Sequence, residues 1–198
     1  MSRRNKLSRA LFDLAPMRPA GRRIFARRRR IQVPGQSTAT KFFRNLEQLS
    51  ALDGPLAGLT AGRRFRGLVA GCSEGCEAYS LAGHLALSRP NLDFIIDACD
   101  ISEDALATAM AGRYGRQHGL GDTSNPRKRD LEARLFTRSG DIWEVADDIR
   151  SRVHFESADV LSPGFSRYRG YDCMFGQNFL IHMNDSDAAQ AFAVRTSL

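Results

Sequence analysis

The stretch Leu68-Val69-Ala70-Gly71-Cys72-Ser73-Glu74-Gly75-Cys76-Glu77-Ala78-Tyr79-Ser80-Leu81-Ala82 decides the fold of this chain. A short apolar run stops at a turn bracketed by Gly71 and Gly75, and apolar residues then resume at helical spacing. This pattern predicts a strand, a tight loop and a helix, with a loop backbone that can approach a small ligand closely. Taken alone, the pattern also fits a loop that only turns a corner, so the flanking segments decide between the two readings.

Strands and helices alternate on either side of this loop. Residues 92–100 read as a second buried strand that ends in Asp100, and Ser102 is expected to cap the helix that follows. Further strands are expected at 153–155 and 171–175. This order predicts an α/β fold, a Rossmann-like doubly wound parallel sheet with its ligand at the carboxyl ends of the strands. The polar residues expected at that edge are Glu77, Asp100, Asp159 and Asn178.

Asp100 points to the kind of ligand. It stands 29 residues after Gly71, at the end of the second strand, where a carboxylate can accept hydrogen bonds from both hydroxyls of a ribose. The acids Glu77 and Asp100 converge on the loop and no lysine does. We therefore expect a nucleoside with a charged amino-acid tail rather than a phosphate.

Two further segments complete the predicted domain. Thr40 is expected to cap a helix with apolar residues at helical spacing and Arg44 near its first turn. Residues 115–152 read as an insertion on the sheet, a small subdomain or lid, with a helix at 131–136 and a short strand at 141–145.

The charge of the chain is concentrated at its start. The net charge is +7, but residues 1–36 hold eleven Lys and Arg against Asp13 alone, whereas residues 37–198 hold 18 basic and 21 acidic residues. We expect a basic N-terminal arm over 1–36, with one or two short helices, and one domain over 37–198. Nucleic acid, anionic lipid and an acidic protein surface are all suitable partners for such an arm, and a solvated tail is the plain alternative.

Composition narrows the class further. With 42% hydrophobic and 26% charged residues and no apolar run of membrane-spanning length, the chain is expected to be a globular cytoplasmic protein. The four cysteines lack the spacing of a disulfide framework, so reduced and mostly buried thiols are expected. Cys72, Cys76 and Cys99 also lack the spacing of a structural zinc site, and no metal is expected.

The successive motifs resemble those of the CheR-type chemotaxis receptor glutamate O-methyltransferases over about residues 37–192. The matching stretches are Thr38 to Arg44, Gly71 to Ser80, Cys99 to Ser102 with Ala105-Leu106, Gly112 to Tyr114, and Tyr171 to His182. The resemblance implies S-adenosylmethionine as methyl donor and a side-chain carboxylate of a receptor, an acidic protein region, as acceptor.

The resemblance also implies roles for individual residues. Thr38, Thr40 and Arg44 match the helix that closes over the cofactor, and Gly71 and Gly75 bracket the loop beneath it. The remaining implied cofactor residues are Glu77 on the loop, Asp100 at the ribose, Asp159 and Val160 beside the adenine, and Asn178 and Phe179 at the fourth strand.

Methyl transfer to a carboxylate needs alignment, exclusion of water and control of charge rather than a strong base, because a carboxylate is already a nucleophile at neutral pH. Arg44 is the residue expected to matter most for catalysis, since a fixed guanidinium can hold a carboxylate bidentately. His182 is a second candidate, at the mouth of the site.

The chain departs from the family pattern at several positions. Cys76 stands where the family has the first of two adjacent acids, and Gln177 and His182 replace an arginine and a tyrosine. Family members also continue with further strands, so we expect a shortened sheet whose fourth strand lies near an open edge. A truncated or degenerate non-catalytic relative, which binds cofactor or a partner in a regulatory role, is therefore the alternative to a methyltransferase. A nucleic-acid contact by the arm is the third hypothesis.

Overall fold

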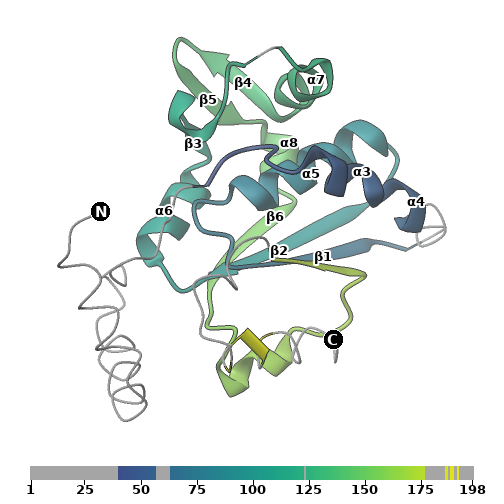
Figure 1. Cartoon of the computed structure of the whole chain (residues 1–198), viewed down its shortest axis with the longest axis vertical. Coiled ribbons are helices and arrows are strands. Elements are labelled where there is room, and N and C mark those ends of the chain that lie inside the picture. Colours follow the sequence, from purple (N-terminus) through teal and green to yellow (C-terminus); the bar gives the residue numbers. More distant parts are fainter. Residues whose placement is uncertain are drawn as a thin grey trace.

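The computed structural model describes residues 40–56, 63–122, 124–176, 186, 188–189 and 191 (Figure 1). The predicted basic arm lies outside these residues. None of the helices in these ranges is long and apolar enough to cross a membrane. The α-helices are α3 (Leu46–Ala51), α4 (Asp53–Leu56), α5 (Cys76–Ser88), α6 (Glu103–Ala111), α7 (Pro126–Leu135) and α8 (Asp147–Arg150), and the 3₁₀ helices are η2 (Arg116–His118) and η3 (Pro163–Arg167). The strands are β1 (Phe65–Ala70), β2 (Phe94–Asp100), β3 (Arg113–Tyr114), β4 (Phe136–Ser139), β5 (Ile142–Val145), β6 (Val153–Ser157) and β7 (Cys173–Phe175).

The central sheet confirms the predicted doubly wound fold. Its strand order is β6-β2-β1-β7, and every pair is parallel. The chain moves outward from β1 through β2 to β6 and then returns to the other side of β1, so the strand order reverses beside β1. Ligands of such sheets bind outside the carboxyl ends of the strands at this reversal, which is where the loop after β1 lies. Among the described residues β7 is an edge strand, as expected.

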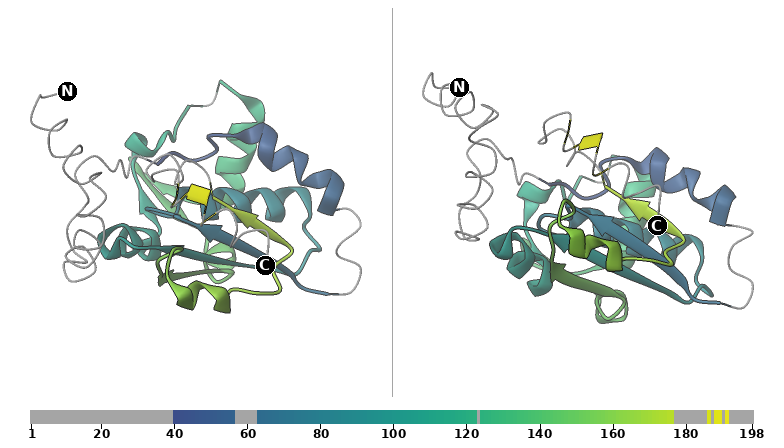
Figure 2. Two further views of the ribbon diagram at one scale, coloured as in Figure 1. Left: turned by 60° about the horizontal axis from the view of Figure 1, so that its bottom comes forward. Right: turned by 90° about the horizontal axis from the view of Figure 1, so that it is seen from below.

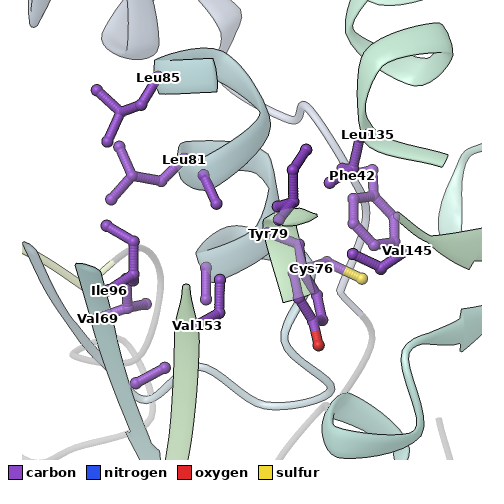
Figure 3. Packing of buried hydrophobic residues seen from close by; sticks show 14 of the residues in the cluster. Phe42, Val69, Cys76, Tyr79, Leu81, Leu85, Ile96, Leu135, Val145 and Val153 are labelled. Carbon is purple, nitrogen blue, oxygen red and sulfur yellow. The ribbon is translucent and has the colours of Figure 1, made fainter. Parts of the chain in front are cut away.

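Helix α5 is the central helix of the molecule. It begins at Cys76, after Gly75 in a left-handed conformation, and most of its residues are buried. One side faces the central sheet, where Leu81 and Leu85 point toward Val69 and Ile96 (Figure 3). The other side contacts α7 and α8, so α5 lies between the sheet and the inserted segment (Figure 2). Burial on both sides explains why this helix has apolar residues on nearly its whole circumference.

The segment between α6 and β6 contains a second, antiparallel sheet. Its strand order is β3-β5-β4, and a tight turn at Gly140, which has a φ of 62°, joins β4 to β5. The helix predicted at 131–136 is α7, which begins earlier because Asn125 accepts a hydrogen bond from the Lys128 amide and Pro126 opens the first turn. Phe136, predicted as helical, is the first residue of β4.

The prediction that Thr40 caps a helix is wrong. Residues 42–45 form a turn, and α3 begins only at Leu46. The amides of Phe42 and Phe43 donate to the carbonyl of His118 at 2.9 Å and to Oγ of Ser80 at 3.0 Å. These long-range hydrogen bonds replace those of a first helical turn, and Phe43 adopts a positive φ of 54°, which a bulky residue tolerates only when its surroundings impose it.

The buried position of His84 predicts that the stability of this fold depends on pH. Its ring is fully buried on α5, with Nε2 at 2.9 Å from Asp53 on α4 and Nδ1 at 3.3 Å from the Arg127 guanidinium and 3.4 Å from Ser88. Burial lowers the pKa of His84 below its ordinary value of 6.5, Arg127 lowers it further, and Asp53 opposes both. The unfolded chain therefore binds this proton more readily, and stability is lost as the pH falls below that ordinary value.

We expect urea denaturation to show a loss of stability between about pH 7.5 and about pH 5 that is smaller in His84→Gln than in the parent chain. Carboxylates such as Asp148, whose pKa is lowered by the hydrogen bond from Arg134, remain in both proteins, so the difference between their slopes isolates the histidine. Equal slopes would show that His84 does not couple protonation to folding.

Candidate functional site

The loop after β1 is held tightly against β2. The amides of Gly71 and Cys72 both donate to the carbonyl of Cys99, at 2.8 and 3.0 Å, and the amide of Gly75 donates to Cys72 at 2.9 Å. The backbone has a positive φ at Gly71 (71°), Ser73 (50°) and Gly75 (83°). Glycine adopts this conformation without strain, but Ser73 does not, and strained residues of this kind concentrate at ligand sites.

Asp100, at the end of β2, joins this loop to the start of α6. Its Oδ2 accepts a hydrogen bond from the Ser73 amide at 2.7 Å, and its Oδ1 accepts one from the Ser102 amide at 2.9 Å. An ionised carboxylate has about four acceptor positions. About two therefore remain, and because the residue is only partly buried a ligand can reach them.

The segment after β6 lies beside the same strand end. The amide of Ala158 donates to the carbonyl of Asp100 at 3.0 Å, which places the next residues, Asp159 and Val160, at the carboxyl edge of β2. Asp159 is exposed and its Oδ1 accepts a hydrogen bond from the Leu161 amide at 2.8 Å. Val160 is buried in a small apolar cluster that includes Cys99. The structure thus brings these two predicted residues close to Asp100.

On the other side of the loop, the turn at 42–45 carries Arg44 to the start of α5. The same Ser80 hydroxyl that accepts the Phe43 amide donates to the carbonyl of Cys76 at 2.6 Å. Burial raises the pKa of the Cys76 thiol far above its ordinary value, against a hydrogen bond from Thr40 and the charge of Arg44, which lower it. Thr40, Arg44 and the first residue of α5 are therefore neighbours. The resemblance matched Thr40 and Arg44 to a helix, but here both precede α3, and Arg44 lies in the turn at 42–45.

Burial favours the neutral thiol form of the cysteines at the site. Cys72, Cys76 and Cys99 are buried, as expected, and Cys173 is partly exposed. Burial raises the pKa of Cys72, with a smaller contribution from the charge of Asp100, and it raises the pKa of Cys99 to about 12. Within the described ranges no group of three or more His, Cys, Asp or Glu residues could hold a metal ion.

The inserted segment makes two contacts with the loop after β1 that were not predicted from the sequence. The hydroxyl of Tyr114 donates to the carbonyl of Glu74 at 2.7 Å, and Nε2 of His118 lies 2.9 Å from Oε2 of Glu74. The side chains of Tyr114 and His118 are both buried. Tyr114 and His118, which follow Glu74 by 40 and 44 positions in the sequence, therefore hold the loop after β1 in place. No periodic sequence pattern predicts contacts over such a separation. Only the Gly-Arg-Tyr motif ending in Tyr114 could have indicated the first of them.

The remaining predicted residues are divided between described and undescribed parts of the chain. Glu77 lies in the first turn of α5, partly exposed, and its charge helps to raise the pKa of Cys72. In the segment that follows β7, Gly176 is described and the residues from 177 to 185 are not. Thr38, Asn178, Phe179 and His182 lie outside the described residues, and their roles stay predictions.

Curated relatives of this chain are methyltransferases by name. The chain is 32% identical over 153 residues to the "Probable biofilm formation methyltransferase WspC" of Pseudomonas aeruginosa, which covers 73% of this chain and 35% of that protein. The protein of the same name from Pseudomonas putida is 32% identical over 162 residues, or 78% and 37%. "Chemotaxis protein methyltransferase 1" of P. aeruginosa is 30% identical over 129 residues, or 62% and 46%. The chain thus spans little more than a third of the length of the two WspC proteins.

Solved structures resemble the chain more distantly. The magnesium protoporphyrin IX methyltransferase (ChlM) from Synechocystis PCC 6803 with bound SAH matches with a TM-score of 0.42 and 18% identity, over 98% of this chain and 67% of that one. A likeness at this level carries no argument about activity. The sequence pattern described as "CheR methyltransferase, SAM binding domain" matches residues 38–194. Since this match takes in most of the sequence, the chain belongs to the CheR methyltransferase family through its SAM-binding domain.

Proposed function

We propose that this chain transfers a methyl group from S-adenosylmethionine to a glutamate side chain of an acidic protein, such as the cytoplasmic region of a chemoreceptor. The observation that carries the proposal is the position of Asp100. Its carboxylate is fixed at the carboxyl edge of β2 by the amides of Ser73 and Ser102, with acceptor capacity left for hydroxyl groups. Family membership and relatives named "Chemotaxis protein methyltransferase" support the reaction and the acceptor.

The described residues fit the chemical groups of this cofactor. Asp100 offers a carboxylate to the ribose hydroxyls, and Asp159 and Val160 stand beside it for the adenine. The charged amino-acid end needs partners of both signs, and Arg44 and Glu74 are close enough to Cys76 to shift its pKa in opposite directions. Proposed contacts of the remaining residues come from the family resemblance; these residues are Thr38, Thr40, Gly71, Gly75, Glu77, Asn178 and Phe179.

When bound, S-adenosylmethionine supplies a sulfonium methyl group that a carboxylate can attack without a base. The protein then has to align the acceptor and exclude water. Arg44 is the proposed catalytic residue, because a guanidinium can hold a carboxylate in one orientation through two hydrogen bonds. The turn that carries it is fixed by the buried rings of Phe42 and Phe43, which belong to the main apolar core, and by the hydrogen bond from the Phe43 amide to Ser80 on α5. His182 is proposed to lie at the mouth of the site.

The distribution of charge along the chain supports an acidic acceptor protein. We propose that residues 1–36 form a basic arm that contacts an acidic protein surface, and that residues 37–198, which carry a small negative net charge, form the methyltransferase domain. A receptor region rich in glutamate would be attracted to such an arm. Because the proposed acceptor is a cytoplasmic receptor region, we place the protein in the cytoplasm.

Isothermal titration of the purified chain with S-adenosylhomocysteine tests the proposal. We expect binding, and we expect Arg44→Ala to weaken it about tenfold or more because a charge-assisted hydrogen bond is lost. Arg138→Ala is the matched control, since Arg138 is an exposed arginine on β4 and should bind like the parent chain. Absence of binding at millimolar nucleoside would rule out the proposed function. Binding without tritiated methyl transfer to a glutamate-rich receptor fragment would instead favour a non-catalytic relative.

A further inference from the structure

The first residue of α5 carries no charge. Cys76 is fully buried, and burial raises the pKa of its thiol far above neutrality. A ligand ammonium group near the start of this helix, where the N-terminal amides already repel cations, needs a carboxylate from another position. A carboxylate that binds such an ammonium group would have to come from a residue close to Cys76.

Glu74 is an acid in the same loop, two residues before Cys76. Its carboxylate is close enough to Cys76 to help raise the pKa of that thiol. The side chain is 28% exposed, so one part of it is fixed in the protein and another part reaches the surface of the site. Oε2 lies 2.9 Å from Nε2 of His118, whereas no hydrogen bond from a described residue reaches Oε1. One oxygen is thus held and the other can accept from a ligand.

His118 is built to hold this carboxylate. The ring is buried, and the amide of Gly115 points at its Nδ1 from 3.4 Å. Nδ1 also lies 3.3 Å from the carbonyl of Gly115. Because an ionised carboxylate can only accept, the hydrogen bond to Glu74 requires the proton on Nε2, and in a neutral ring Nδ1 then accepts from the Gly115 amide. The rings of Tyr114 and His118 pack edge to face with centroids 5.0 Å apart, and the Tyr114 hydroxyl donates to the carbonyl of Glu74. Both the main chain and the side chain of Glu74 are therefore anchored by the inserted segment.

Glu74 in the loop and Asp100 at the end of β2 provide two carboxylates at the same site. The Ser73 amide donates to Asp100, and the next residue is Glu74, so the acids act on neighbouring positions of the strained turn. The loop from Gly71 to Gly75 contains no lysine or arginine. A ligand with hydroxyl groups at one end and an ammonium group at the other matches this pair of acids, whereas a phosphate does not.

We propose that Glu74 is a cofactor-binding residue that accepts the α-ammonium group at the amino-acid end of the cofactor, and that His118 is the positioning residue that orients it. This inference rests on the proposed function and deepens it. Glu74 takes over the negative charge that Cys76 cannot provide, two positions earlier in the chain. The inserted segment thereby takes part in cofactor binding, although it lies outside the parallel sheet.

Titration with two nucleosides distinguishes contacts to the amino-acid end of the cofactor from contacts to its ribose and adenine. S-adenosylhomocysteine carries the amino-acid end, whereas 5′-methylthioadenosine stops just beyond the sulfur. We expect Glu74→Gln to weaken S-adenosylhomocysteine about 10- to 100-fold and to leave 5′-methylthioadenosine within about twofold of the parent chain, because only the charged hydrogen bond is lost. Asp100→Asn is the matched control and should weaken both nucleosides, since both contain the ribose.

His118 is tested through the same selectivity between nucleosides, which a merely structural role would not change. His118→Leu removes the donor and should reduce the preference for S-adenosylhomocysteine, whereas His118→Gln keeps an N–H donor and should restore much of it. Thermal unfolding of each variant establishes that it is folded at the temperature of the titration.

The outcomes separate this inference from the proposed function. If Glu74→Gln weakens both nucleosides equally, or neither, the acid does not contact the amino-acid end and the inference is wrong. If the parent chain binds neither nucleoside, the proposed function itself is wrong, and the assignment of Glu74 falls with it.

Discussion

Replacement of Gly75 by alanine is expected to lower the free energy of unfolding by about 2 to 5 kcal/mol. Gly75 has a φ of 83°, where a Cβ atom costs about 1 to 2 kcal/mol. The new Cβ would also lie 2.8 Å from Cβ of Ala109 and 3.0 Å from Cζ of Phe155. Such overpacking in a buried loop costs about 1 to 3 kcal/mol more. Urea denaturation followed by circular dichroism would measure the total.

Gly140→Ala is the matched control for this prediction. Gly140 also has a positive φ, 62°, but nothing lies within 4 Å of the Cβ that alanine would add. It should therefore show the conformational cost alone, about 1 to 2 kcal/mol. If the two variants were equally stable, the close approach of Gly75 to α6 and β6 would not contribute to the fold.

Asp100→Ala is expected to reduce the affinity for S-adenosylhomocysteine about 100-fold or more, the largest effect on binding in this chain. Two charge-assisted hydrogen bonds to ribose hydroxyls would be lost. The same change removes the acceptor of the Ser73 and Ser102 amides, so the loop after β1 and the start of α6 would also lose their common anchor. We therefore expect about 1 to 3 kcal/mol of destabilisation as well, measured by urea denaturation beside the titration.

Asp104→Ala separates this effect from a general loss of negative charge. Asp104 is exposed in the first turn of α6, close in sequence to Asp100, and no ligand role is proposed for it. It should keep the affinity of the parent chain and lose only a few tenths of a kcal/mol of stability through the helix dipole. Similar affinity losses in both variants would mean that Asp100 acts through charge at a distance and not as a ribose ligand.

The central sheet could be predicted because its signals are local. The strand predicted at about 65–71 is β1, Phe65–Ala70, and the strand predicted at 92–100 contains β2, Phe94–Asp100. Ser102 accepts the Ala105 amide and caps α6, as its position before two acidic residues predicted. In each case a few consecutive residues determine both the element and its boundary, through burial of alternating or periodic apolar side chains and through one capping hydrogen bond.

Predictions failed where hydrogen bonds to distant residues override local preference. Thr40 precedes a helical pattern, but the amides of Phe42 and Phe43 bond to the insertion and to α5, so no helix begins there. Likewise, Phe136 is apolar and follows a helical run, yet it pairs with Val145 as a strand residue. Antiparallel pairing with Val145 of β5, 9 residues later in the sequence, therefore determines the conformation of Phe136.

The sequence by itself determined the parallel sheet, the glycine loop after its first strand and the acid at the end of the second, because each depends on neighbours in the chain. Only the tertiary structure decided how that loop is held. Besides its hydrogen bonds to Cys99 and Asp100, the loop is held by the contacts of Glu74 with Tyr114 and His118, 40 and 44 positions later in the sequence. Contacts over such separations depend on the packing of α5 between the parallel sheet and the helices of the inserted segment. The loss of chain entropy that they require is compensated only once that core has formed.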